Sequence, residues 1–228
     1  MKTILITGGS SGLGLRLTVD FLRTGNKVIA SYFSNSQPLN KLAEKYPDLS
    51  FFYLDLSALN KVKFSGQKLD LLILNAGIIH NELLLKESSE NFQEIIQKNL
   101  TANFTICRQL VPGLKKSENS HIIFISSLSA LKGNIGQAAY SAGKAGLIGL
   151  AKSLAKELAE DNIKVNVILP GFMKSKQTIT LPQTIVNTYK NANILRRFNT
   201  LKEISSFINW LSATRNISGQ IFNLDSRL

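Results

Sequence analysis

The stretch "TILITGGSSGLG", residues 3–14, is the clearest indication of the fold. A short apolar run rich in β-branched side chains leads directly into glycines at positions 8, 12 and 14, and an amphipathic segment follows. A strand, a glycine turn and a helix in direct succession are typical of the first half of a βαβ unit. The glycines permit a tight turn and let the backbone approach a ligand closely. We therefore expect a phosphate-bearing ligand at the N-terminus of this first helix.

Six further apolar runs of similar length follow along the chain. They cover residues 27–32, 50–56, 69–75, 121–126, 164–169 and 220–224. Several are apolar at nearly every position, as strands covered on both faces require, and most segments between them have helical spacing. This alternation predicts an α/β doubly wound Rossmann fold with a seven-stranded parallel sheet flanked by helices. Ligands bind such folds at the carboxyl ends of the strands.

Two segments near the C-terminal end differ in their patterns. Residues 200–211 begin with Thr200 and Glu203 at the spacing of a capping box and predict a last helix. Residues 172–198 show no clear period, and we expect a lid over the ligand crevice there. Apolar residues of this lid either line a pocket or pack on the core: Leu181, Ile185, Tyr189 and Ile194.

The composition is that of one folded domain. The chain has 228 residues, of which 44% are hydrophobic and 18% charged, and we assign residues 1–228 to a single nucleotide-binding domain. The net charge of +12 attracts phosphate-bearing ligands, but the basic residues are scattered and not interleaved with aromatic ones. This scatter argues against a dedicated nucleic-acid surface.

The N-terminus and the single cysteine indicate the compartment. The first apolar run is too short for a signal peptide or a membrane span. Cys107 has no partner for a disulfide, and nothing near it has metal-ligand spacing. We therefore expect a cytoplasmic protein that binds neither a membrane nor a metal.

The segment "ASYFSNSQP", residues 30–38, indicates which dinucleotide binds. It lies about 20 residues beyond the glycines, where many dinucleotide sites have an acid that binds the adenosine ribose, and it contains no acid. Ser31, Ser34, Asn35 and Ser36 offer donors that do not repel a 2′-phosphate. NADP(H) is therefore favoured, and NAD(H) stays open because no arginine clamps the phosphate.

Three other strand ends carry polar or small residues. Asp55 follows the third run and either meets the adenine amino group or opens a turn. Residues 75–77, "NAG", end the fourth run, where short side chains leave room for a ligand or simply make a turn. Ser126 and Ser127 end the fifth, where a serine can donate a hydrogen bond to a substrate carbonyl.

The stretch "QAAYSAGKAGLIG", residues 137–149, places Tyr140 and Lys144 one helical turn apart. A free phenol has a pKa of about 10, and we expect the neighbouring ammonium to lower the pKa of Tyr140 toward neutrality. Such pairs also occur by chance on helix surfaces. The surrounding alanines and glycines open space beside this pair, which favours a chemical role.

Together these motifs resemble the short-chain dehydrogenase/reductase family, and most closely its 3-oxoacyl-(acyl-carrier-protein) reductases. "TGGSSGLG", "NAG", "ISSLSALKGNIGQAAYSAGKAG" and "VNVILPGF" match in type, order and spacing over essentially the whole chain. The resemblance implies NADP(H)-dependent interconversion of a ketone and a secondary alcohol by a homo-oligomer, a tetramer or a dimer. Its implied substrates are small ketones and acyl thioesters, including those bound to a carrier protein.

The resemblance also assigns roles to residues. Tyr140 donates a proton to the carbonyl oxygen, Lys144 binds the nicotinamide ribose and tunes Tyr140, and Ser127 orients the substrate. Asn99, in "QKNLTANF", supports a water relay to the lysine. The implied cofactor-binding residues are Gly8, Ser10, Ser11, Gly12, Leu13, Gly14, Ser34, Asn35, Asp55, Leu56, Asn75, Ala76, Gly77, Tyr140, Lys144, Pro170, Gly171 and Ser175.

The sequence departs from the family pattern at several positions. Leu74 replaces the first asparagine of "NNAG", and Ser175 replaces a threonine while retaining its hydroxyl. The tail "NLDSRL", residues 223–228, lacks the paired glycines that usually follow the last strand, which puts tetramer contacts there in question. Glu118 and Asp161 stand where carrier-protein reductases tend to have basic docking residues, which argues against docking of a carrier protein.

Three functions stay open at this point. The favoured one is NADPH-dependent reduction of a 3-oxoacyl thioester or similar ketone, with Tyr140 as proton donor. The second is oxidation of an alcohol, sugar or steroid, because the lid sets the pocket and its composition fits many shapes. The third is a nucleotide-sensing protein without catalysis, against which the complete set of Asn99, Ser127, Tyr140 and Lys144 argues.

Overall fold

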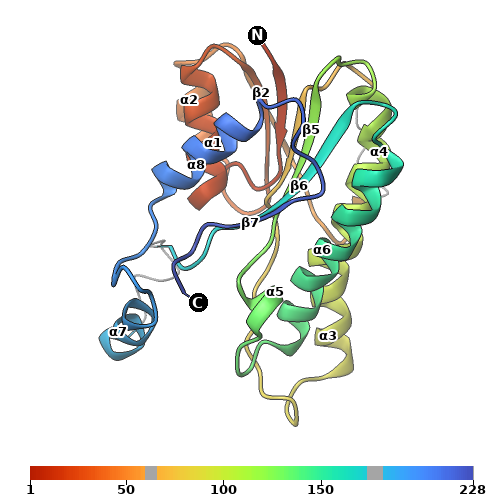
Figure 1. Cartoon of the computed structure of the whole chain (residues 1–228). Helices are drawn as coiled ribbons and strands as arrows, with labels where there is room; N and C mark the ends of the chain where they lie inside the picture. Colours follow the sequence, from red (N-terminus) through yellow and green to blue (C-terminus); the bar gives the residue numbers. More distant parts are fainter. Residues whose placement is uncertain (60–65, 174–181, 228) are drawn as a thin grey trace.

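The structure, a computed structural model, describes residues 1–59, 66–173 and 182–227. Its centre is a seven-stranded, all-parallel sheet with the order β3-β2-β1-β4-β5-β6-β7 (Figure 1). The strands are β1 (Thr3–Ile6), β2 (Lys27–Tyr32), β3 (Leu49–Tyr53), β4 (Leu71–Leu74), β5 (Ser120–Ile125), β6 (Ile163–Leu169) and β7 (Ile221–Asn223). All seven predicted strands are confirmed, with ends that differ from the expected ones by at most three residues.

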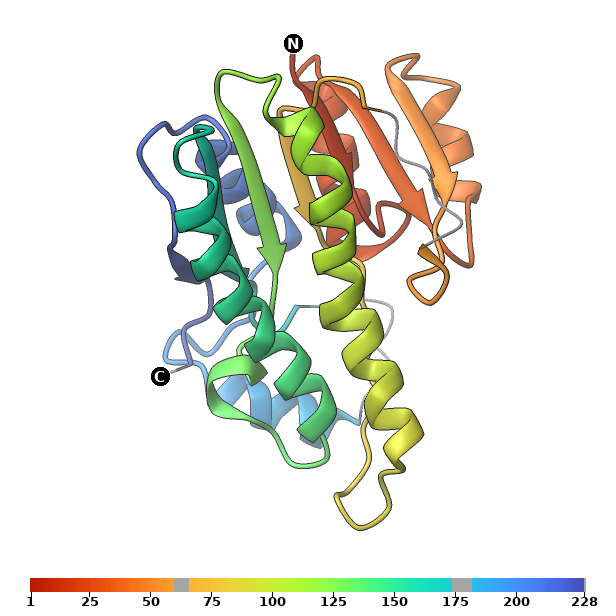
Figure 2. The same ribbon diagram turned by 90° about the vertical axis from the view of Figure 1, so that its right-hand side faces the viewer.

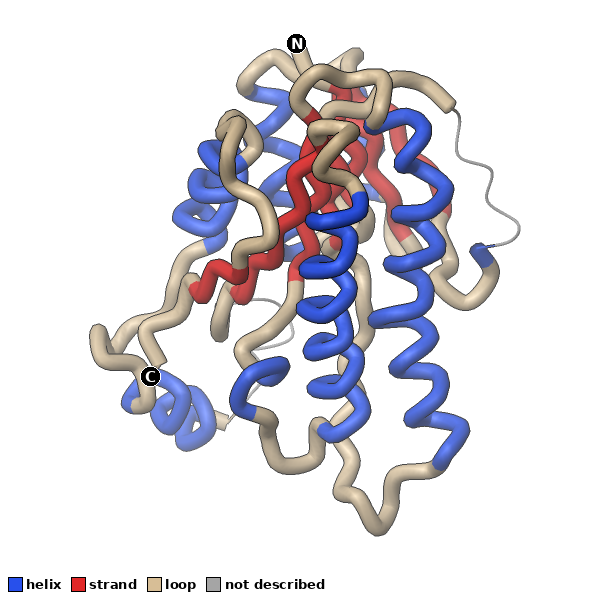
Figure 3. The backbone as a smooth tube through the Cα atoms, turned by 45° about the vertical axis from the view of Figure 1, so that its right-hand side comes forward, coloured by secondary structure: helices blue, strands red, loops and turns tan. Residues whose placement is uncertain are grey.

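Helices cover both faces of this sheet, as the doubly wound fold requires. One face carries α1 (Gly12–Arg23), α2 (Gln37–Ala43) and α8 (Leu201–Leu211). The other carries α6 (Ala138–Glu157) beside a long, nearly continuous helix made of α3 (Ser89–Ile96), the π-helical turn η2 (Gln97–Thr101) and α4 (Ala102–Leu114) (Figures 2 and 3). The short helices α5 (Ser129–Lys132) and α7 (Gln183–Asn191) lie beyond the carboxyl ends of the strands.

Each face of the sheet has its own core because successive strand residues point to opposite sides. In β1, Ile4 and Ile6 pack with the buried residues of α1 and α8, whereas Leu5 packs with those of α4 and α6. In β4, Leu71 and Ile73 face the first layer and Leu72 the second. Two buried faces explain why these strands are apolar at nearly every position.

The last helix forms as predicted, whereas the segment before it contains an unpredicted helix. The Thr200 side chain accepts a hydrogen bond from the Glu203 backbone N–H, and the Glu203 carboxylate accepts one from the Thr200 N–H, which completes the capping box of α8. Helix α7 lies within the expected lid and has no buried residue, and its nine residues are too few for a clear helical period in the sequence. Residues 174–181, including Leu181 and Ser175, lie outside the described part of the chain.

The order of the strands places the ligand crevice. Connections run outward from β1 to β2 and β3 on one side and from β4 to β7 on the other, so the order reverses between β1 and β4. Thr7 joins the two strand ends, because its hydroxyl accepts hydrogen bonds from the N–H groups of Asn75 (2.9 Å) and Ala76 (3.0 Å). Within the described ranges, no helix is long and apolar enough to cross a membrane.

We expect two glycine-to-alanine substitutions to have opposite effects on stability. A Cβ at Gly14 would lie 2.1 Å from the Gly8 carbonyl oxygen and 2.7 Å from Asn75 Nδ2, so Gly14→Ala forces the turn and α1 apart. A Cβ at Gly149 in α6 meets nothing within 4 Å. In urea unfolding, Gly14→Ala should lower the free energy of unfolding by about 1–3 kcal/mol. Gly149→Ala should raise it by about 0.5–1 kcal/mol. A Gly14→Ala protein as stable as wild type would contradict the close approach of the turn.

Candidate active site

The turn after β1 is held from both sides of the crevice. Asn75 Nδ2 donates hydrogen bonds to the carbonyl oxygens of Thr7 (3.0 Å) and Gly8 (3.3 Å), and the Gly8 N–H donates to Ser31 Oγ (3.0 Å). Gly8 and Gly12 have positive φ angles of 67° and 51°, which favour glycine. These contacts fix the backbone of the glycine turn beside the ends of β2 and β4.

The N-terminus of α1 has the features of a phosphate site. Ser11, at the N-cap, has an extended backbone, and no side chain of the described residues caps the helix. The first N–H groups of a helix have no partner within it, and they attract anions. A Cβ at Gly12 would meet nothing within 4 Å, so the space in front of this turn is open, and the Leu13 side chain is buried in the core behind it. The turn therefore fits a pyrophosphate that approaches the backbone of residues 10–14.

The end of β2 differs in part from the expected ribose-binding surface. Ser31 is buried and its hydroxyl already accepts the hydrogen bond from Gly8, so this residue supports the glycine turn instead of facing a ligand. Ser34 and Asn35 are exposed, and Asn35 Oδ1 accepts a hydrogen bond from the Gln37 N–H (2.9 Å). The expectation that Ser31 faces the 2′-phosphate is therefore wrong, whereas Ser34 and Asn35 are exposed near the strand end.

The end of β3 combines a turn with an aromatic pair. Asp55 Oδ1 accepts a hydrogen bond from the Ser57 N–H (2.8 Å), so Asp55 does open the turn that we considered. Leu56 is buried in the core, which leaves only its backbone for a ligand. Phe33 and Tyr53 stack at 5.8 Å with an angle of 28° between their rings, and both are exposed. The sequence did not reveal this pair, because Phe33 directly follows β2 and Tyr53 ends β3, twenty residues later.

Lys144 and Asn99 meet at Gly77, in the stretch that follows β4. The Lys144 ammonium is buried and donates a hydrogen bond to the Ile125 carbonyl at the end of β5 (2.9 Å). Asn99, fully buried in η2, donates to the Ile78 carbonyl (2.9 Å) and accepts from the Ile78 N–H (3.0 Å). A Cβ at Gly77 would lie 2.4 Å from Asn99 Oδ1 and 3.5 Å from Lys144 Nζ. The missing side chain of Gly77 therefore allows the two residues to come together.

The π-helical turn around Asn99 was not predicted. Such turns occur mostly as single bulges in α-helices, often at functional sites. Here the turn is followed by Asn103, whose side chain donates a hydrogen bond to the Asn99 carbonyl oxygen (2.7 Å). The resemblance indicated Asn99, but the sequence has no proline or glycine in this segment that would mark a local change in helical winding.

Tyr140 lies between Ser127 and Lys144. Its hydroxyl is hydrogen-bonded to Ser127, and Lys144 Nζ lies 5.8 Å from the centroid of its ring. Burial raises the pKa of Tyr140 and outweighs the lowering effect of the hydrogen bond with Ser127. The expectation that Lys144 lowers this pKa is therefore wrong for the protein alone, and the phenol stays protonated at neutral pH. Burial also lowers the pKa of Lys144, to about 8.

The two serines after β5 have different surroundings. Ser126 is buried and donates a hydrogen bond to the Lys144 carbonyl oxygen (2.8 Å), so it ties β5 to α6. Ser127 is half-buried, bonded to Tyr140 and 3.2 Å from Ser129 Oγ. Ser127 is thus the serine whose hydroxyl lies beside the phenol.

The end of β6 is crowded by the C-terminal tail. Pro170 is buried, and Gly171 has a φ angle of 74°. A Cβ at Gly171 would lie 2.1 Å from Asp225 Oδ2, and that oxygen accepts a hydrogen bond from the Phe172 N–H (3.2 Å). Asp225 also forms a short ion pair with Arg227 (2.6 Å). Sequence reasoning noted only that paired glycines are missing from this tail and did not predict the ion pair.

Comparisons with known proteins identify the family of the chain. A family model described as short chain dehydrogenase matches residues 2–185. The chain is 34% identical to the 3-oxoacyl-[acyl-carrier-protein] reductase FabG of Thermotoga maritima, with 100% of this chain and 97% of that protein covered. It is 39% identical to the FabG protein of Rickettsia prowazekii over 78% of this chain and 75% of that one. Nodulation protein G of a Rhizobium species is 32% identical, with 100% and 96% covered.

The family match spans most of the chain, and the Thermotoga and Rhizobium relatives align over nearly their whole lengths. The seven-stranded parallel sheet flanked by helices is consistent with this family. This protein therefore belongs to the short-chain dehydrogenase family and is an oxidoreductase that uses a nicotinamide cofactor.

Proposed function

We propose that the protein reduces a 3-oxoacyl thioester or similar ketone to the secondary alcohol with NADPH. The observation that carries the proposal is the contact of the protonated Tyr140 hydroxyl with Ser127, beside the buried ammonium of Lys144. These groups lie at the carboxyl edge of the sheet, which the glycine turn also borders. The names of the similar proteins, two of which are 3-oxoacyl-carrier-protein reductases, support the direction and the substrate class.

Each residue of the site would have a separate role in the reduction of the ketone. NADPH supplies a hydride to the carbonyl carbon when it is bound. Ser127 and Tyr140 would both donate hydrogen bonds to the carbonyl oxygen, and Tyr140 would transfer its proton to that oxygen as the negative charge develops. Lys144 would then stabilise the phenolate of Tyr140 and bind the nicotinamide ribose. Asn99 would act as a positioning residue that holds residues 77 and 78 in place.

The protonation states of the site suit reduction at neutral pH. Because burial raises the pKa of Tyr140, the phenol carries its proton and can act as the donor. With a pKa of about 8, most Lys144 side chains are charged at pH 7. The reverse reaction would need the phenolate, so oxidation of an alcohol should become favourable only at higher pH.

The cofactor-binding residues would lie along the crevice. The backbone of Gly8, Ser10, Ser11, Gly12, Leu13 and Gly14 would bind the pyrophosphate, and residues 75–77 would line the nicotinamide half. Ser34 and Asn35 would face the 2′-phosphate of NADPH without the repulsion that an acid would cause, and Asp55 and the Leu56 backbone would meet adenine. Pro170 and Gly171 would border the carboxamide.

The partners follow the same proposal. Glu118 and Asp161 do not favour docking of an acidic carrier protein, and Asp161 is already paired with Lys115 (2.8 Å). A free thioester is therefore the simpler substrate. By analogy with the family, we also propose that the protein is a homo-oligomer. From the sequence, we propose that residues 1–228 form a single domain with a lid at 172–198, and that the protein is cytoplasmic.

We expect the purified protein to oxidise NADPH, in preference to NADH, when acetoacetyl thioester is added.

Tyr140→Phe should lower kcat by about 10²–10⁴-fold because it removes the proton donor, while NADPH binding measured by fluorescence stays as in wild type. The matched control is Tyr46→Phe, which removes a hydroxyl outside the site. Full turnover by Tyr140→Phe would rule out the proposed donor. Intact NADPH binding without oxidation across a panel of ketones would favour the nucleotide-sensing alternative.

We expect Lys144→Met to stabilise the fold while abolishing turnover. The pKa of Lys144 falls from 10.5 to about 8 on folding, so the unfolded chain binds more protons between these pH values and wild-type stability rises across them. At pH 7 the variant should have a free energy of unfolding about 1–2 kcal/mol above wild type, after the loss of the bond to Ile125 is included. The difference should shrink from pH 8 to 10.5 in urea unfolding. A difference that does not change with pH would show that Lys144 is not penalised by burial.

A further inference from the structure

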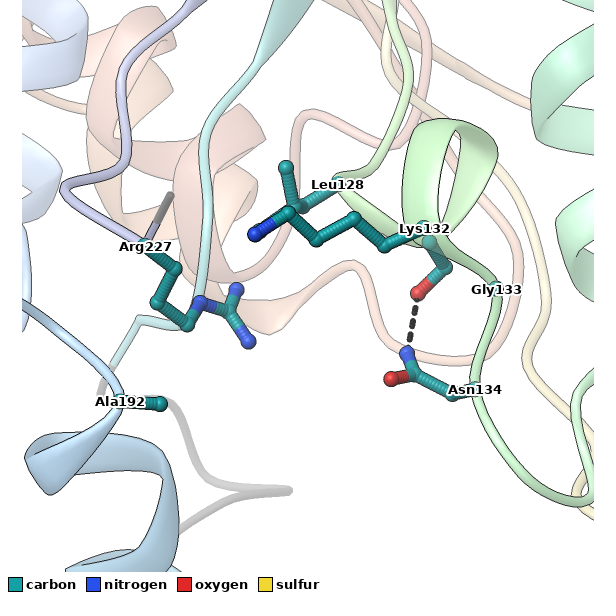
Figure 4. Close-up of a pocket in the computed structure, with 7 residues that line it drawn as sticks. Leu128, Lys132, Gly133, Asn134, Ala192 and Arg227 are labelled. Atoms are coloured by element: carbon teal, nitrogen blue, oxygen red, sulfur yellow. Dashed lines mark hydrogen bonds between the residues drawn. The ribbon is translucent and has the colours of Figure 1, made fainter.

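A cavity of about 160 Å³ lies beside the candidate active site, between α5 and the C-terminal tail (Figure 4). Leu128, Ser129, Lys132, Asn134, Ala192 and Arg227 are among its lining residues. Ser129 connects it to the site, because Ser129 Oγ lies 3.2 Å from Ser127 Oγ. The cavity therefore borders the serine that the proposed function assigns to the substrate carbonyl.

Two cationic side chains point into this space. Figure 4 shows Lys132, from α5, and Arg227, from the tail after β7, extending toward each other across the cavity. Within residues 1–59, 66–173 and 182–227, the Lys132 ammonium has no hydrogen bond or ion pair. No Asp or Glu is among the residues that line the cavity. One exposed cation on a helix would be unremarkable, but here two from distant parts of the chain converge.

Arg227 is held in place by Asp225. The carboxylate accepts hydrogen bonds from Arg227 Nε (2.9 Å) and Nη2 (2.6 Å), and it also accepts one from the Phe172 N–H (3.2 Å). The guanidinium lies over the Tyr189 ring, 5.5 Å from its centroid. Nη1 has no hydrogen-bond partner among the described residues. An arginine fixed in this way loses little side-chain entropy when it binds an anion.

The charges of this cluster do not cancel. Burial alone would raise the pKa of Asp225, but its hydrogen bonds with Arg227 outweigh this effect and lower the pKa, so the carboxylate is ionised at neutral pH. Two cations and one carboxylate leave one positive charge, and that carboxylate is already bonded to Arg227 and Phe172. A single anionic group in the cavity would balance the cluster.

We propose that Lys132 and Arg227 bind a carboxylate on the ketone substrate, so that the enzyme favours small keto acids over neutral ketones of the same size. This inference rests on the proposed function, because it takes Ser127 as the residue that contacts the carbonyl. Because Ser129 both lines the cavity and contacts Ser127, a small substrate is the kind that would place a carbonyl at Ser127 and an anion in the cavity. The phosphate at the far end of a pantetheine arm would lie well beyond this small space.

The test compares 4-oxopentanoate with its methyl ester, which lacks the negative charge and is larger by one methyl group. Isothermal titration measures the binding of each compound to the whole protein, and NADPH oxidation measures kcat/KM for each. We expect wild type to bind the acid at least about tenfold more tightly than the ester. Lys132→Gln should remove most of this preference for the acid and leave the ester unaffected. Arg227→Lys keeps the positive charge but loses the planar set of guanidinium N–H donors. It should weaken binding of the acid by a smaller factor than Lys132→Gln does.

The matched control is Lys27→Gln, which removes the same charge from an exposed residue at the opposite edge of the sheet. It should change neither compound's binding. Equal binding of acid and ester by wild type, or an equal loss of both in Lys132→Gln, would overturn the proposed carboxylate site. Reduction of the ester and of acetoacetyl thioester without any preference for the acid would overturn this inference alone. Charge-selective binding without any NADPH oxidation would instead refute the proposed function and leave the anion site standing.

Discussion

The site depends on one buried cation held at a crowded point of the sheet edge. Lys144 donates its hydrogen bond to the carbonyl oxygen that ends β5, and it lies against Gly77 and Asn99. Burying an ammonium destabilises its charged form, which is why the pKa of Lys144 falls to about 8. The protein tolerates this cost at the position where a positive charge can act on a neighbouring phenol. The small residues on both sides of Lys144 in α6 let the helix approach η2, since a Cβ at Gly143 would lie 3.2 Å from Asn99.

The doubly wound sheet brings the remaining groups to the same edge. Thr7 bonds the ends of β1 and β4, Asn75 supports the glycine turn, and Ser126 ties β5 to α6. Each bond crosses between segments that are far apart in the sequence, yet all of them lie at the carboxyl ends of strands. The glycine turn and α6 are therefore each bonded directly to a neighbouring strand end. The tail after β7 adds Asp225 and Arg227 to the far side of the crevice.

The sequence predicted those features that depend on local pattern. The apolar runs located the seven strands because both faces of each strand are buried, and the spacing of Thr200 and Glu203 located α8. The four-residue spacing of Tyr140 and Lys144 correctly placed them on one face of α6. Features that depend on tertiary contacts were not predicted. Ser31 supports the glycine turn through a bond to Gly8, which is distant in the sequence. The π-helical turn at Asn99 is a change in helical winding that has no local sequence signal. The ion pair of Asp225 with Arg227 depends on the tail packing against Phe172, which is also distant in the sequence. The pKa of Tyr140 rises because of burial, which spacing along a helix does not reveal.

The most direct test of this account is the rate of NADPH oxidation by Gly77→Ala in a single turnover with acetoacetyl thioester. The added methyl group would lie 2.4 Å from Asn99 Oδ1, so Asn99 must give up its two bonds to Ile78 and crowd Lys144. We expect the rate constant of Gly77→Ala to be at least about tenfold below that of wild type, while circular dichroism shows that the variant is folded. A Gly77→Ala enzyme with the wild-type rate constant would show that the meeting of Asn99 and Lys144 at Gly77 does not set the reactive geometry.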